Sequence, residues 1–220
     1  DVGLLAEEGR SKPSSSGGVL GGLCACFSVE YYQPYFDVNT EEVVTRIKCA
    51  LLFCGGDSPF LDVVRDKPDA YGPWWISTTL VFLISVTSHL KSLLRADGTG
   101  YDFKVVTFAA MTVYNYLGFT ALAFWLALKY WLKTQLSILQ CACILGYSLS
   151  VYVLASLLCV FTYLTWPTLI AASVLSSLFA AKSILPVIEH HEKQQVVIVI
   201  GGLAAANAVL MLVIKLALYQ

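Results

Sequence analysis

Long apolar blocks separated by short polar connections dominate the chain from about residue 74 onward. Each block reaches or exceeds the roughly 20 residues that a helix needs to cross a hydrocarbon layer about 30 Å thick. The pattern therefore predicts an all-α membrane protein with a bundle of five transmembrane helices. The predicted spans are about 74–94, 105–129, 136–161, 166–188 and 195–218.

The connection between the third and fourth blocks leaves the number of spans open. It is a tight turn at Thr165-Trp166-Pro167. A proline can also kink a helix without ending it. The alternative is one long helix that packs as a re-entrant pair, which would leave four spans.

The residues before the first block predict a soluble N-terminal arm. The stretch from Gly9 to Gly22 is rich in Ser and Gly, so it can bury too little apolar surface to offset the entropy of ordering. We therefore predict a flexible tail over 1–27 and a cytosolic arm over 28–72.

A short amphipathic helix is predicted within the arm, because apolar residues recur at three- and four-residue intervals over about 40–54. Asn39 is placed to cap it, with acidic residues in the first turn. Arg46 and Lys48 are assigned to its polar side. The helix could lie along the cytosolic leaflet or pack against the base of the bundle. Its mixed acidic and basic face suits anionic lipid poorly, which favours packing.

The composition agrees with a chain solvated mostly by lipid. Hydrophobic residues make up 57% of the 220 residues and charged residues 13%, and the mean hydropathy is +0.70. The formal net charge of -1 provides no broad basic surface of the kind that binds nucleic acid. Membrane lipids are therefore expected partners and nucleic acid is not.

Charge asymmetry predicts the orientation in the membrane. With the N-terminus in the cytosol, the cytosolic connections carry more basic residues than the first luminal loop. The first thirty residues lack a basic region followed by an apolar core, so no cleavable signal is expected, and a start at Asp1 rather than Met leaves the true N-terminus open. We expect a cytosolic N-terminus and a luminal C-terminus. The residues compared are Arg65, Lys67, Lys129, Lys133 and Lys193 inside, against Lys91, Arg95 and Lys104 outside.

No motif in the chain predicts catalysis, a cofactor or a metal site, so an enzyme is not expected. Glu189-His190-His191-Glu192 carries zinc-type side chains, but adjacent side chains on a helix point about 100° apart and the HExxH spacing is missing. A solvated loop is expected there. The seven cysteines predict no disulfide framework, and Cys24 and Cys26 are either free thiols or palmitoylated.

Polar side chains inside the predicted spans are few. Asn207 lies in the small-residue segment Gly-Gly-Leu-Ala-Ala-Ala-Asn-Ala, which predicts tight helix packing supported by an amide hydrogen bond. No Asp or Glu falls clearly in mid-membrane, and a transporter of protons or cations would normally need one. A cavity lined by Asn115 with Ser, Thr and Tyr would instead favour a channel or transporter.

Three motifs occur in sequence order: Glu-Tyr-Tyr-Gln-Pro-Tyr-Phe-Asp-Val from Glu30 to Val38, Asp69-Ala70-Tyr71-Gly72-Pro73 at the first span, and Gly146-Tyr147 in the third. Together they resemble motifs of the Yip family of endomembrane proteins. The resemblance covers about residues 28–218, with the five-span spacing, and Ala70 stands where the family usually has Leu. It implies a Yip-type transmembrane domain over 73–220, with Gly146 and Tyr147, like Asn207, engaged in helix packing.

This resemblance implies a non-enzymatic membrane scaffold of the Golgi or a related endomembrane, acting in vesicle trafficking. Its partners would be Rab-type small GTPases and other Yip-family proteins. The alternatives are an accessory transmembrane subunit of a larger membrane complex, and a channel, transporter or lipid-remodelling protein. The arm residues expected to contact partners are Tyr31, Tyr32, Pro34, Tyr35, Phe36 and Asp37.

The motif at the start of the first span also has a physical interpretation. Pro73 suits the first turn of a helix, because its missing N–H has no intrahelical partner there. Asp69 would lie near the positive end of the helix dipole and could cap the free N–H groups. Tyr71 belongs at the level of the lipid headgroups. The four residues Asp69, Tyr71, Gly72 and Pro73 either position the arm against the bilayer or bind a partner directly.

Overall fold

The computed structural model describes residues 36, 38–52, 60–94, 103–188 and 193–218. Regular structure among these residues is helical throughout, and all of them belong to the unit Tyr35–Gln220. Two short helices, α3 (Thr40–Leu52) and α4 (Phe60–Asp66), come first. The remaining elements are α5 (Tyr71–Leu94), α6 (Phe103–Tyr130), α7 (Ile138–Ser148), α8 (Ser150–Leu158), the 3-10 turn η1 (Thr162–Leu164), α9 (Thr165–Ile188), α10 (Lys193–Val213) and the π-helical turn η2 (Ile214–Leu218).

The described residues contain five helical segments long and apolar enough to cross a membrane, which confirms the predicted all-α, five-span architecture of a multi-pass membrane protein. The third segment joins α7 and α8, and the fourth joins η1 and α9. Between the third and fourth spans, the chain leaves the helix after Leu158, passes through η1 and starts α9 at Thr165. The four-span alternative is therefore wrong, and Pro167 lies in the first turn of α9, where its missing N–H costs nothing.

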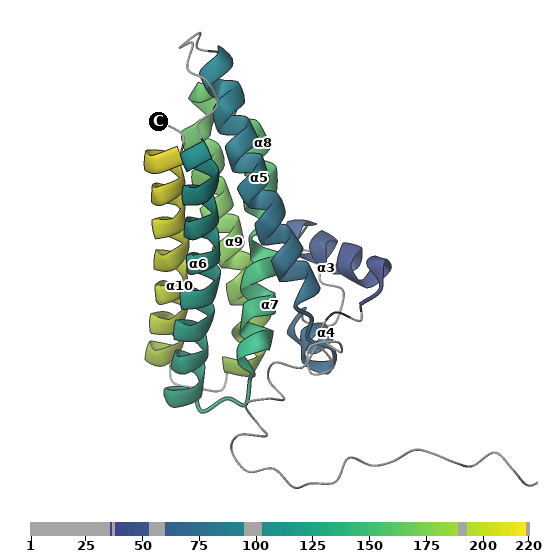
Figure 1. Cartoon of the computed structure of the whole chain (residues 1–220). Helices are drawn as coiled ribbons and strands as arrows, with labels where there is room; N and C mark the ends of the chain where they lie inside the picture. The colour runs from purple at the N-terminus through teal and green to yellow at the C-terminus, as the bar shows by residue number, and fades with distance from the viewer. Residues whose placement is uncertain (1–35, 37, 53–59, 95–102, 189–192, 219–220) are drawn as a thin grey trace, which may run out of the picture. The chain divides into compact units, whose positions relative to one another are not determined.

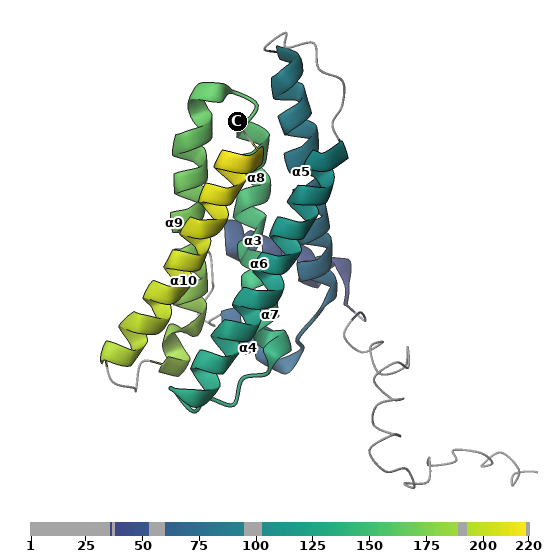
Figure 2. The ribbon, with the colours of Figure 1, turned by 60° about the vertical axis from the view of Figure 1, so that its left-hand side comes forward.

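The third span lies at the centre of the bundle. About 72% of its most apolar stretch is buried, compared with 17% for α6. Its half α7 contacts α5, α6 and α9, and α8 contacts α5 and α9. Figures 1 and 2 show α10 on the outside of the bundle, beside both α6 and α9. Most residues of α7 and α8 are consequently in contact with protein, although Leu154 and Leu157 of α8 remain about half exposed.

The third span is also interrupted. Leu149 separates α7 from α8, although its backbone angles remain right-handed helical. Two serine hydroxyls beside it donate to backbone oxygens three residues back, Ser148 to Leu145 at 2.6 Å and Ser150 to Tyr147 at 2.7 Å. Such local hydrogen bonds compete with the regular helical ones and bend a helix.

Asn207 connects four helices through its side-chain amide and its backbone oxygen. Its Oδ1 accepts hydrogen bonds from Tyr116 of α6 and Ser176 of α9, each at 3.0 Å, and its backbone oxygen accepts one from Tyr152 of α8 at 3.0 Å. The residue itself belongs to α10 and is fully buried. Because lipid offers these groups no other partners, the cluster ties α10 to its neighbours.

Candidate functional site

The short link between α4 and α5 carries a fully buried carboxylate, that of Asp69. Asp69 Oδ2 forms an ion pair with Arg46 of α3 and accepts a hydrogen bond from the Tyr147 hydroxyl of α7 at 2.7 Å. The Cys143 thiol, one turn earlier on α7, donates to the backbone oxygen of Asp69. A charge with no access to water is thus surrounded by donors from two helices, as buried charges require.

The position of Arg46 in the structure differs from the position predicted from the sequence. The residue was assigned to the polar side of the amphipathic helix, but only 4% of it is exposed, so this assignment is wrong. Its guanidinium binds Asp69 and donates through Nη2 to the backbone oxygen of Lys67 at 2.9 Å. Arginine is buried when it is paired in this way, because its planar fork can satisfy several acceptors at once.

The pairing fixes α3 to the bundle. α3 contacts α7 and α8, so of the two alternatives for the amphipathic helix the structure has the packed one. A second ion pair between the same segments, Lys67 with Glu42 at 3.6 Å, is 46% and 39% exposed. An exposed pair contributes at most about 1 kcal/mol, so the buried one dominates the attachment.

Two glycines let the start of α5 pack tightly against α7. A Cβ on Gly72 would overlap the hydroxyl end of the Tyr147 ring. In the opposite direction, a Cβ on Gly146 would overlap Pro73, including its backbone Cα at 2.7 Å. The motif at the first span and the Gly-Tyr pair of the third span are therefore two halves of one contact, with the Asp69–Tyr147 hydrogen bond at its edge.

The interaction with Arg46 replaces the predicted role of Asp69 as a helix cap. In the described residues its carboxylate is occupied by side chains from α3 and α7. The first backbone hydrogen bond of α5 runs instead from the N–H of Trp74 to the carbonyl of Ala70, at 3.2 Å. Helix α5 thus starts at Tyr71, two residues after the buried Asp69.

The other residues singled out from the sequence lie at the start of α5, in the described part of the arm, or outside the described residues. Asp69, Gly72 and Pro73 are buried, whereas Tyr71 is 40% exposed and its ring lies 6.0 Å from that of Trp75. Of the arm residues expected to contact partners, Phe36 is described and is 49% exposed. The remaining ones lie outside the described residues: Tyr31, Tyr32, Pro34, Tyr35 and Asp37, as do Cys24, Cys26 and the segment 189–192.

Sequence reasoning missed two further features near the site. Cys143 lies within an apolar run, and no local pattern links it to Asp69, 74 residues away. Ser137 and Gln140 form a reciprocal capping box at the start of α7, and the Gln140 amide also donates to the backbone oxygen of Arg65 at 3.3 Å. The capping box does have a sequence signature, Ser-x-x-Gln before an apolar run.

The site is suited to holding elements together rather than to chemistry. The carboxylate is neutralised by a guanidinium, and the Tyr147 ring whose hydroxyl binds it packs edge-on against the Phe60 ring, with centroids 5.7 Å apart. Removing one member of a buried ion pair typically costs about 3–5 kcal/mol, because the other charge stays buried without its partner. The arrangement therefore makes α3, the link and the central span a single mechanical unit.

Comparison with known proteins finds similarity to one family. The family model for the Yip1 domain matches residues 57–215. The "Protein YIPF1 homolog" of Dictyostelium discoideum is 31% identical over 195 residues, which cover 86% of this chain and 55% of the relative. "Protein YIP5" of Schizosaccharomyces pombe is 34% identical over 126 residues, or 56% of this chain and 49% of the relative.

The chain spans about half the length of the curated relatives it matches. No solved structure matches it. The matched residues include the link at Asp69, the interlocked glycines and all five spans, and the resemblance inferred from the three motifs is confirmed. The chain belongs to the Yip1 domain family.

Proposed function

We propose that the chain is a non-enzymatic membrane scaffold of the Golgi or a related endomembrane that acts in vesicle trafficking. Membership of the Yip1 domain family suggests a membrane trafficking protein. In this proposal the arm lies in the cytosol and binds Rab-type small GTPases, the bundle associates with other Yip-family proteins, and the C-terminus is luminal.

The buried Arg46–Asp69–Tyr147 cluster is the observation that carries the scaffold proposal. It fastens α3 to the central span, so in this proposal a partner bound by the arm stays attached to the membrane bundle. The aromatic run that we propose as the docking segment ends just before α3, and its described member, Phe36, is half exposed. Exposed aromatic side chains are common at the centres of protein interfaces.

The polar groups of the spans favour packing over transport. The Asn207 amide is occupied by neighbouring helices. Asn115, whose presence in a cavity lining would favour a channel, donates to the backbone oxygen of Met111 on its own helix at 2.7 Å. An apolar hollow between α6 and α10 is lined by apolar residues and one threonine, and Asn115 is not among them. This distribution supports a scaffold over a channel or transporter.

Gentle purification of the tagged protein, with its companions quantified by mass spectrometry, tests the proposal. Replacing Tyr31, Tyr32, Tyr35 and Phe36 by Ala should abolish recovery of small GTPases while membrane insertion remains intact. A matched control replaces exposed aromatics at the opposite end of the bundle, Phe161 and Tyr163, which are 50% and 77% exposed.

GTPase recovery that is equal for the arm variant and the control would contradict the proposal. Recovery of the same large set of membrane proteins with both variants, and of no GTPase with the unaltered chain, would instead favour an accessory subunit of a larger complex. The two results are distinguishable in one experiment because all companions are counted together.

A further inference from the structure

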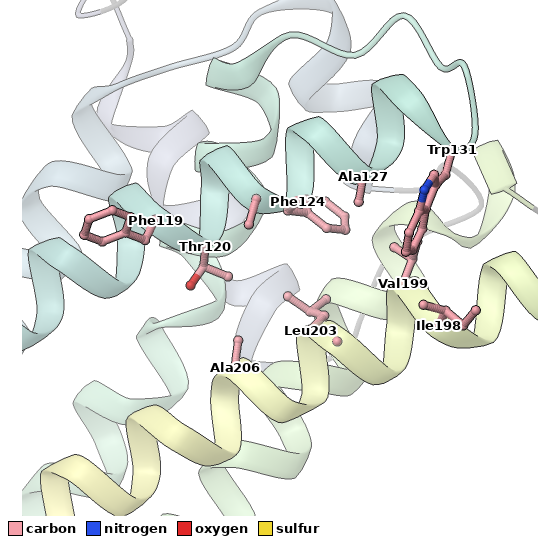
Figure 3. Close-up of a pocket in the computed structure, with 11 residues that line it drawn as sticks. Phe119, Thr120, Phe124, Ala127, Trp131, Ile198, Val199, Leu203 and Ala206 are labelled. Atoms are coloured by element: carbon pink, nitrogen blue, oxygen red, sulfur yellow. The ribbon is translucent and has the colours of Figure 1, made fainter.

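An apolar hollow of about 440 Å³ lies between α6 and α10. Figure 3 shows side chains from the two helices facing each other across it. Phe119 and Ala206 lie toward its mid-span end, and Trp131 and Ile198 lie at the other end, where α6 stops and α10 begins. The hollow is thus a groove directed along the two helices.

Small side chains make the groove deep. Gly202 of α10 lines it, and a Cβ built on this glycine meets nothing within 4 Å. Ala123 and Ala127 of α6 line the opposite wall. Small residues usually allow two helices to approach closely, but here they leave open space between large residues such as Phe119, which is 69% exposed.

The size and surroundings of the groove favour a hydrocarbon chain as its occupant. Both walls belong to membrane-spanning helices, so hydrocarbon and not water is the surrounding medium. A helix about 10–12 Å in diameter would fill a volume of this size with roughly one turn. A single extended hydrocarbon chain is thin enough to lie along the whole groove.

Basic residues flank the end of the groove that lies near the membrane surface. Lys129 and Lys133 stand on either side of Trp131 in the sequence, both are exposed, and Lys129 Nζ lies 4.5 Å from the centroid of the Trp125 ring. Lys193 opens α10 at the same end of the bundle. Tryptophan with lysine is typical of the headgroup level, and this charge complements an anionic headgroup.

We propose that the groove between α6 and α10 binds one acyl chain of an anionic bilayer phospholipid, with its headgroup at Lys129 and Lys133. None of the residues that line the groove belongs to the Asp69 cluster or to the arm, so the proposal goes beyond the scaffold function and is tested independently of it. Lipid bound there would pack against the face of α10 that is turned toward α6.

Photo-crosslinking in nanodiscs tests the acyl-chain site. The full chain is reconstituted with phosphatidylserine that carries a photoreactive group in its acyl chain, and the labelled peptides are identified. Labels should concentrate on the stretches of α6 and α10 that line the groove. Gly202→Leu fills the groove and should lower this labelling about tenfold, which corresponds to roughly 1.4 kcal/mol of binding.

Gly201→Leu is the matched control. It changes the neighbouring glycine in the same helix, which also has open space around it but does not line the groove. Labelling of this variant should equal that of the unaltered chain, and both variants should remain monodisperse. Equal labelling of the Gly202 and Gly201 variants would overturn the proposal, as would labels spread evenly over all lipid-facing helices.

The headgroup assignment has its own comparison. The same photoreactive chain on phosphatidylcholine should label the groove less, and Lys129→Gln with Lys133→Gln should remove the preference for phosphatidylserine. Lys104→Gln, at the opposite end of α6, should leave the preference intact. Equal labelling by the two lipids would overturn the anionic headgroup, and crosslinks from α10 to another protein in place of lipid would make the groove a helix-docking surface instead.

Discussion

At the scale of single residues, α5 and α7 are matched through two reciprocal contacts. Gly72 accommodates the Tyr147 ring, and Gly146 accommodates Pro73. The residues that resemble the Yip family motifs at these positions thus have a physical reason to occur together, because each glycine leaves room for a ring from the other motif. The account predicts that these glycines are intolerant of even one added methyl group.

Gly146→Ala should lower the thermal unfolding midpoint of the purified protein. The added Cβ meets the Pro73 backbone, which cannot move aside as a flexible side chain can, and overpacking of this kind costs about 1–3 kcal/mol. Gly118→Ala is the control, because a Cβ there meets nothing within 4 Å. It should raise stability by about 0.5–1 kcal/mol through helix propensity. Equal shifts in the two variants would show that the contact is unimportant.

The partner of Asp69 could not be predicted from local patterns. A helical wheel assigns a charged residue to the solvent side, since arginine is almost never fully buried unless it is paired. The partner of Arg46 lies 23 residues further along the chain, beyond any helical periodicity. The sequence did identify Asp69 and Tyr147 as special positions, because they lie in motifs resembling those of a known family.

At the scale of elements, apolar length predicted the spans well but not their internal breaks. The third span was expected to be continuous over about 136–161, whereas it divides at Leu149 into α7 and α8. Hydropathy carries no signal for this break, because serine hydroxyls satisfied by backbone oxygens occur in regular helices as well. The helix at Thr40–Leu52 followed from periodicity, but the side on which its arginine lies did not.

Asn207→Leu should weaken the association of α10 with the bundle. The substitution leaves the hydroxyls of Tyr116 and Ser176 without their acceptor in a buried place, and interhelical hydrogen bonds in membranes are worth about 0.6–2 kcal/mol each. We expect a loss of roughly 1–2 kcal/mol in unfolding by denaturing detergent.

Asn115→Leu serves as the comparison for that experiment. Its amide binds only the backbone of its own helix among the contacts described, and it is exposed. This variant should unfold like the unaltered protein. If the two variants were equally stable, the Asn207 cluster would have no role in holding the helices together.

At the scale of the whole molecule, the number of spans was predictable and their arrangement was not. Five apolar blocks of sufficient length gave five spans. Which span lies in the centre depends on contacts between distant segments, such as the hydrogen bond from Tyr152 to Asn207, 55 residues apart. The third span contains many small and polar residues that are buried. The reason for their burial becomes clear only once the neighbouring helices are known.

The proposed orientation is testable with glycosylation acceptors. An Asn-x-Ser sequence should be glycosylated when it is added after Gln220 or inserted at residues 161–163, because both positions are luminal in the proposed topology. The same sequence added to the N-terminal arm should stay unmodified, because glycosylation takes place in the lumen. Modification of the arm would reverse the orientation and place the proposed docking segment on the wrong side for Rab-type GTPases.

The central claim is that Arg46 and Asp69 fasten the arm helix to the bundle, and amide hydrogen exchange of α3 in the full chain in nanodiscs tests it most directly. Arg46→Met leaves the Asp69 carboxylate buried without its counter-charge, a loss of about 3–5 kcal/mol, so α3 should exchange much faster while α10 keeps its protection. Lys48→Met, on the exposed side of the same helix, should change nothing. Adding Asp69→Asn to Arg46→Met should restore part of the protection. Identical exchange of α3 in the unaltered chain and in Arg46→Met would contradict the account.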